Sequence, residues 1–83
     1  MKTTIQGFRY DTDKAKKIGK IKRGNAGEAL YVHAEIYRTP RSGNLFLAGS
    51  GGALTLFKGR ENVILPVTEN QLKGVKYERD QTA

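Results

Sequence analysis

Residues 29–58 read ALYVHAEIYRTPRSGNLFLAGSGGALTLFK, and this stretch decides the fold. Its first part alternates strictly between apolar residues and aromatic or polar ones, so that two sets face opposite ways: Leu30, Val32, Ala34 and Ile36 against Tyr31, His33, Glu35 and Tyr37. A period of two residues is the spacing of a β-strand with one buried face and one solvated face. We therefore expect a central β-strand here.

The rest of this stretch predicts that the chain turns back on itself. Residues 39–44 contain proline, glycine and asparagine, which favour tight turns. Residues 45–48 are expected to return as a short apolar strand, the glycine-rich run 49–52 to bend the chain, and residues 53–57 to continue as a third strand. These elements predict an antiparallel meander.

Three segments precede the central strand. Residues 5–10 predict a first strand, with Gly7 as a bulge. Acidic and hydroxyl side chains at 11–13 suit the start of a helix, so residues 12–18 are expected to form a short helical turn or a tight turn. Residues 20–23 predict a short strand, and a glycine-containing loop follows it.

After the meander, residues 63–65 predict a strand that Pro66 ends or confines to the edge of a sheet. Thr68 and Gln71 have the spacing of a capping box, which predicts a short C-terminal helix. The fold class expected is α+β: a small antiparallel β-meander of about four or five strands with a short N-terminal helical turn and a short C-terminal helix. Residues 1–77 should form a single β-rich domain, and residues 78–83 a frayed tail.

Length and composition limit the size of the core, the cellular compartment and the association with membranes. A chain of 83 residues has room for one modest core. It has no cysteine, which fits a reducing compartment. No apolar run is long enough to cross a bilayer, and the N-terminus lacks the apolar core of a signal peptide. We expect a soluble protein of the bacterial host cytoplasm, with no membrane partner.

The net charge of +7 comes from 15 basic and 8 acidic residues. A charge of this sign attracts phosphate backbones, acidic protein surfaces or anionic headgroups, and it excludes a mimic of DNA. The alternative is that the charge mainly keeps a small domain soluble. The basic residues expected to bind a partner are Lys16, Lys17, Lys20, Lys22 and Arg23, followed by Arg38 and Arg41.

Catalysis is hard to assemble from the residues present. The chain has one histidine, no cysteine and two serines, and neither serine has the spacing of a nucleophile elbow. We assign no catalytic residue, no metal ligand and no cofactor. A small ribonuclease using His33 and Glu35 as acid and base is the enzymatic alternative. Against it, a solvated strand face ordinarily carries such polar residues.

The same strand face suggests a nucleic-acid interaction. Tyr31, His33 and Tyr37 are candidates for stacking on bases while nearby cations hold phosphates. Tyrosines also pair across strands for stability alone. The glycine run 49–52 has the composition of an anion-binding nest, but Leu54 stands where the dinucleotide fingerprint needs a glycine, so a bend or bulge is the favoured interpretation.

Several short motifs resemble a family of small proteins encoded by bacterial phages and mobile elements. They are Gly7, Tyr10-Asp11-Thr12, Ala15, Ile18-Gly19, Tyr37-Arg38-Thr39, Gly43, Leu45-Phe46-Leu47, Gly49, Gly51-Gly52-Ala53 and Ile64-Leu65-Pro66-Val67-Thr68. Glu35 matches an acid that members often carry, whereas Ser50 replaces an acid common inside their glycine run. The members are mostly of unassigned function, and small proteins from such settings include anti-CRISPR and other counter-defence inhibitors.

The charge, the missing catalytic groups and this resemblance lead to one expectation. The protein is a non-enzymatic phage or mobile-element protein that binds and inhibits or modulates a nucleic-acid-handling bacterial machine, in the manner of an anti-CRISPR protein. Its partner is a bacterial defence complex or another protein complex that handles nucleic acid. The alternative is a basic module that binds RNA or DNA directly.

Overall fold

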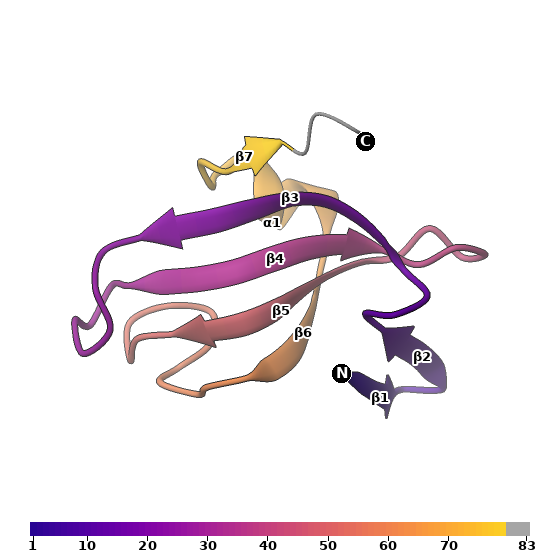
Figure 1. Ribbon diagram of the computed structural model, residues 1–83, viewed down its shortest axis with the longest axis horizontal. Coiled ribbons are helices and arrows are strands. Elements are labelled where there is room, and N and C mark those ends of the chain that lie inside the picture. The colour runs from indigo at the N-terminus through magenta and orange to yellow at the C-terminus, as the bar shows by residue number, and fades with distance from the viewer. Residues whose placement is uncertain (80–83) are drawn as a thin grey trace.

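The structure is a computed structural model in which residues 1–79 are described. Within this range the chain forms seven strands and one helix, arranged as two antiparallel sheets (Figure 1). In chain order the elements are β1 (Lys2–Ile5), β2 (Phe8–Asp11), β3 (Lys16–Arg23), β4 (Val32–Arg38), β5 (Leu45–Gly51), β6 (Val63–Val67), α1 (Glu69–Lys73) and β7 (Glu78–Arg79).

The larger sheet has five strands in the order β6-β5-β4-β3-β7. Strands β3 to β6 are consecutive antiparallel neighbours, which confirms the predicted meander. The chain then passes through α1 and returns to the opposite edge, where β7 pairs with β3 through Gly19 opposite Arg79 and Lys20 opposite Glu78. The segment 68–79 therefore joins the two edges of the meander.

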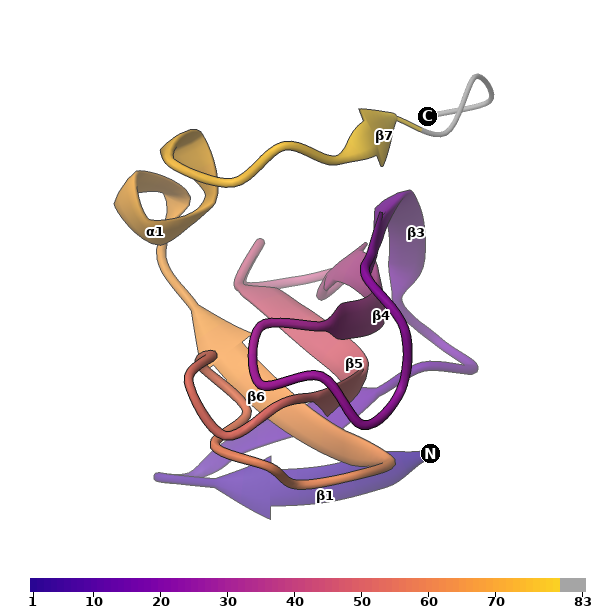
Figure 2. The same ribbon diagram turned by 90° about the vertical axis from the view of Figure 1, so that its left-hand side faces the viewer.

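The two faces of this sheet are covered by different parts of the chain. Figure 2 shows α1 and the chain leading to β7 on one side and β1 on the other. The core lies on the α1 side, where burying apolar surface supplies most of the folding free energy. It consists of Ile21, Val32, Ala34, Ile36, Leu45, Leu47, Phe57, Val67 and Leu72.

A smaller aromatic cluster packs on the other side of the sheet. Phe46 of β5 is fully buried there. The ring of Tyr10 from β2 meets it edge-on, with the centroids 5.3 Å apart and the planes at 69°. Tyr37 of β4 stacks on it at 5.3 Å with the planes at 15°. These contacts fix the β1–β2 hairpin to the sheet.

One prediction for the N-terminal part is wrong, and another is confirmed only for its first residues. Residues 5–10 are not one bulged strand: Gln6 and Gly7, with φ values of 52° and 82°, form the turn of a hairpin between β1 and β2. The helical or tight turn expected at 12–18 is present only at residues 12–15, as a single turn in which the Ala15 N–H donates to the Asp11 carbonyl at 2.9 Å. Strand β3 begins directly after this turn. Its backbone N–H and C=O groups form hydrogen bonds with β4 instead of the hydrogen bonds that a helix would provide.

The glycine run also differs from the prediction. Strand β5 continues to Gly51 without a bend, and residues 53–57 form turns rather than a third strand. A side chain at Gly49 would collide with the backbone and Cβ of Ala34 on β4, and one at Gly51 would collide with Thr55 and Phe57. These glycines therefore allow close packing of neighbouring chain segments.

The predictions for the C-terminal part are mostly confirmed. Strand β6 is an edge strand that contains Pro66. In the capping box, the Thr68 hydroxyl accepts from the Gln71 N–H at 3.2 Å and the Gln71 side chain accepts from the Thr68 N–H at 2.8 Å. The helix has only five residues, however, so the protein is a small, mostly β domain rather than a clear α+β fold.

Glu78 and Arg79 were expected to fray, but they form β7. The remainder of the predicted tail, residues 80–83, lies outside the described residues. Within residues 1–79, no helix has the length and apolar character needed to span a membrane.

Candidate functional site

Strands β3 and β4 place lysines beside polar side chains on the face opposite the core. Lys20 lies across from Glu35 and Lys22 lies across from His33, so all four side chains share one face with Tyr37. They line an open groove of about 520 Å³, which we call the lysine groove. Its other walls come mainly from Met1, Thr12, Ala48, Gly49 and Asn62.

The protein's own carboxylates partly offset the charge of this groove. Lys17, opposite Tyr37, forms an ion pair with Glu35. Lys20 lies 3.7 Å from Glu78 of β7. Both pairs are well exposed to solvent, so each contributes at most about 1 kcal/mol and exchanges easily for another partner. Lys22 has no carboxylate of residues 1–79 within ion-pair distance.

His33 is held by the loop that joins β3 and β4. Its Nε2 atom lies 2.9 Å from the Gly24 carbonyl oxygen, which can only accept, so Nε2 carries the hydrogen. The ring also meets Tyr31 edge-on, with the centroids 5.5 Å apart. Both members of the predicted acid–base pair are therefore engaged within the protein. Nε2 of His33 is held by its hydrogen bond to Gly24, and Glu35 is held by its ion pair with Lys17.

The three predicted stacking rings do not form one open platform. Tyr31 is 7% exposed and therefore buried. Tyr37 is half-buried, and one face of its ring is covered by Phe46. Burial, reinforced by the negative charge of Glu35, raises the pKa of Tyr37 above its usual value. Tyr37 therefore remains a neutral hydrogen-bonding group with part of its ring facing the lysine groove.

The remaining predicted basic residues are not on this face. Lys16 and Arg23 pair with Arg38 and Val32, which places them on the core side of the sheet. Alternation along β3 therefore divides a cluster that is continuous in sequence between two surfaces. Arg41 lies in the β4–β5 turn, beside Arg9 and Lys14 from the N-terminal part. Arg9 is not among the predicted cations, because the sequence does not predict the hairpin that brings it there.

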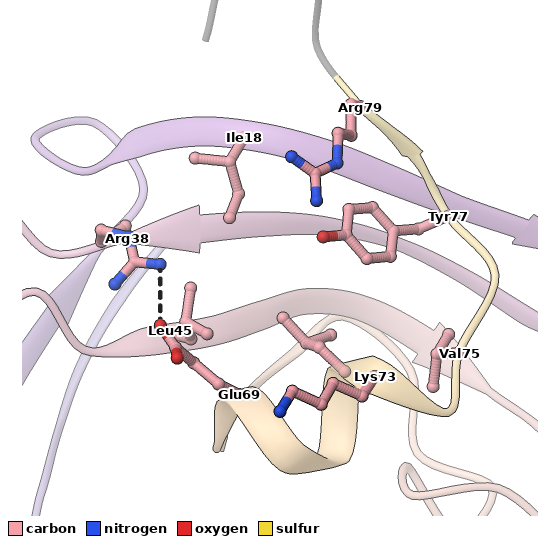
Figure 3. Close-up of a pocket in the computed structure, with 9 residues that line it drawn as sticks. Ile18, Arg38, Leu45, Glu69, Lys73, Val75, Tyr77 and Arg79 are labelled. Carbon is pink, nitrogen blue, oxygen red and sulfur yellow. Dashed lines mark hydrogen bonds and ion pairs between the residues drawn. The ribbon is translucent and has the colours of Figure 1, made fainter.

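Arg38 has a clear structural role. Its guanidinium donates to the Gly43 carbonyl at 2.8 Å and to the Glu69 carboxylate at 3.3 Å. Figure 3 shows this ion pair at one side of a cavity of about 590 Å³ between α1 and the sheet. The Tyr77 ring, with Arg79 at 6.0 Å from its centroid, lies on the far side. Arg38 thus ties α1 to β4.

Residues 1–79 contain no group of three or more histidine, cysteine or acidic side chains that is able to hold a metal ion. The arrangement at the lysine groove is suited to binding an anion through exposed ammonium groups and a phenol. In comparisons with known proteins, no family model, no curated protein and no solved structure matches this chain.

Proposed function

We propose that the protein is a non-enzymatic binding protein that inhibits or modulates a bacterial nucleic-acid-handling machine. On this proposal the lysine groove contacts an acidic surface of that machine, and an anti-CRISPR-like role is the most concrete form. The resemblance to small phage and mobile-element proteins supports the setting. The net charge of +7 supports an anionic partner.

The position of Lys20 and Lys22 carries this proposal. Both project from the same face of β3 into an open groove, one with an exposed, exchangeable ion pair and the other with no ion pair to residues 1–79. Because the strand backbone that carries them is already ordered, binding has to order only the two lysine side chains, at about 0.5–1.5 kcal/mol each. A partner's carboxylates are able to replace Glu78 at Lys20 and to add a contact at Lys22.

A charge-reversal experiment tests the proposal. The double variant Lys20→Glu/Lys22→Glu is compared with Lys73→Glu/Lys76→Glu, which lowers the net charge equally at exposed positions of the C-terminal segment. The readout is co-purification of defence complexes from bacterial cells, with and without nuclease treatment. We expect loss only for the first variant, with thermal stability nearly unchanged. Equal retention by both variants counts against the proposal.

Direct nucleic-acid binding is the second candidate, because Tyr37 presents part of a ring beside the two lysines. Fluorescence anisotropy with labelled single-stranded RNA and double-stranded DNA separates the two. Binding of a nucleic-acid strand through lysines weakens steeply with salt. The logarithm of the binding constant falls with the logarithm of the salt concentration at a slope of about −0.7 to −0.9 per phosphate contact. Absence of binding at low salt removes this candidate and leaves the protein partner.

A further inference from the structure

Two leucines project from the surface of the loop that follows β5. Leu54 is 72% exposed and Leu56 is 44% exposed. Leu30, in the loop before β4, is 58% exposed. The two loops lie side by side, since the Leu54 N–H donates to the Ala29 carbonyl at 3.0 Å. Exposed apolar side chains that gather in this way mark interaction surfaces.

The loop that carries the two leucines is firmly anchored. The side chain of Phe57 is fully buried in the core. The Thr55 hydroxyl donates to the Gly52 carbonyl at 2.7 Å and accepts from the Phe57 N–H at 3.2 Å. Within this turn, Thr55 is half-buried and Phe57 is buried, whereas the two leucines point to solvent. The loop backbone that carries the leucines is already ordered in the free protein. Binding of a partner therefore costs little conformational entropy in this loop.

The leucines border an apolar groove of about 430 Å³ on the core side of the sheet. Its floor is aliphatic and includes Ile21, Val32 and Leu47. Arg23 and Lys58 are the charged residues along it, and none of its lining residues is a carboxylate. No carboxylate of residues 1–79 forms an ion pair with either cation. We call this site the leucine groove.

We propose that the leucine groove docks an acidic amphipathic segment of a protein partner. Apolar side chains of that segment bury against the leucines, and flanking carboxylates meet Arg23 and Lys58. Nucleic acid suits the site poorly, because its floor has no exposed aromatic ring for a base to stack on. A second copy of this chain suits it poorly too, since a symmetric contact brings the same two cations together twice.

This proposal goes beyond the lysine groove, which lies on the opposite face of the sheet. The two sites are therefore separable by mutation. If binding at one groove is disproved, the proposal for the other groove is unaffected. A single partner that uses both grooves would contact both faces of the sheet.

Selection from a phage-displayed library of random peptides tests the leucine groove. The library is selected on the wild-type protein, and the enriched peptides are synthesised and titrated by fluorescence anisotropy. We expect peptides with leucine or aromatic residues at helical or alternate spacing, flanked by aspartate or glutamate. The variant Leu54→Ser/Leu56→Ser should weaken their binding at least about tenfold, since two exposed apolar contacts are lost.

Two further variants keep the test decisive. Lys58→Glu removes a cation of the groove while leaving both leucines, and it should weaken the same peptides. Lys20→Glu/Lys22→Glu should leave their binding unchanged, whatever it does to the partner of the lysine groove. The proposal is overturned if no peptide family is enriched, if the enriched peptides are basic, or if they bind the leucine variant as tightly as the wild type.

Discussion

The Nε2 atom of His33 lies 2.9 Å from the carbonyl oxygen of Gly24, so the only histidine of the chain fastens the β3–β4 loop. Its substitution by alanine removes this hydrogen bond and the edge-on contact with Tyr31. Together these are worth about 1–2 kcal/mol, and for a domain of this size each kcal/mol lowers Tm by roughly 4–8 °C. We expect His33→Ala to lower the thermal midpoint accordingly.

The same variant decides the ribonuclease alternative. Purified wild type and His33→Ala are incubated with a fluorogenic RNA under conditions in which both are folded. If the wild type cleaves RNA and His33→Ala does not, the structural assignment of His33 is incomplete. Lys73→Ala serves as control, because Lys73 is an exposed cation on α1, away from the sheet face that carries His33.

The strand that carries the lysines shows why sequence and structure diverge. Ala15 and Ile18 are three residues apart, which is a helical spacing, and together with the acidic residues before them this spacing favours a helical turn. The structure places a register shift between Lys17 and Gly19, so Ile18 is an extra residue in the strand. A bulge of this kind interrupts the two-residue alternation that is typical of a strand. The spacing of the apolar residues therefore predicted a helical turn where the structure begins strand β3.

This error also limited the prediction of the site. Because the sequence predicts a strand only for residues 20–23, the basic residues from 14 to 23 have no common assignment to the two faces of a sheet, and they are expected to form one cluster. By contrast, the predicted alternation is confirmed in β4, where Val32, Ala34 and Ile36 are buried and the residues between them are only half-buried. Leu54 and Leu56 also alternate with their neighbours, but the packing of Phe57, which only the tertiary structure reveals, turns them outward.

Tyr37 should make the protein less stable in alkali. Burial is the main reason that its pKa lies above the ordinary value of 10.0, with Glu35 as the next cause. As the pH rises through 10 the unfolded chain loses this proton first, so the unfolded state binds fewer protons and stability falls. Below that pH both states are protonated and this contribution is complete.

Urea denaturation at pH 7 and pH 10.5 measures this effect. Tyr37→Phe should reduce the loss of stability between the two pH values, because phenylalanine has no proton to lose. Glu35→Gln removes the second cause and should reduce the loss by less. If Tyr37→Phe shows the same alkaline loss as the wild type, other groups are responsible.

The capping box at Thr68 offers a third test. Thr68→Ala removes the acceptor for the Gln71 N–H at the start of α1. The expected cost is about 1 kcal/mol, since N-cap substitutions typically cost 0.5–2 kcal/mol. Thr68→Ser keeps the hydroxyl and should retain most of the stability. A result in which both variants are equally destabilised would point to the threonine methyl group instead of the hydrogen bond.

Gly49 and Gly74 form a matched pair for the last prediction. A Cβ at Gly49 would press on the Cα and Cβ of Ala34 and on the His33 carbonyl, all on the adjacent strand, whereas a Cβ at Gly74 would meet nothing within 4 Å. Gly74 also has a φ of −85°, which alanine adopts without strain. Gly49→Ala must push β4 and β5 apart at the centre of the sheet, and overpacking of this kind costs about 1–3 kcal/mol. Gly74→Ala should be neutral or stabilise by up to about 1 kcal/mol, because alanine leaves the unfolded chain less freedom. Chemical denaturation of the two variants checks the contrast, and a Gly49→Ala protein as stable as Gly74→Ala would show that the close approach of β4 and β5 has been misjudged.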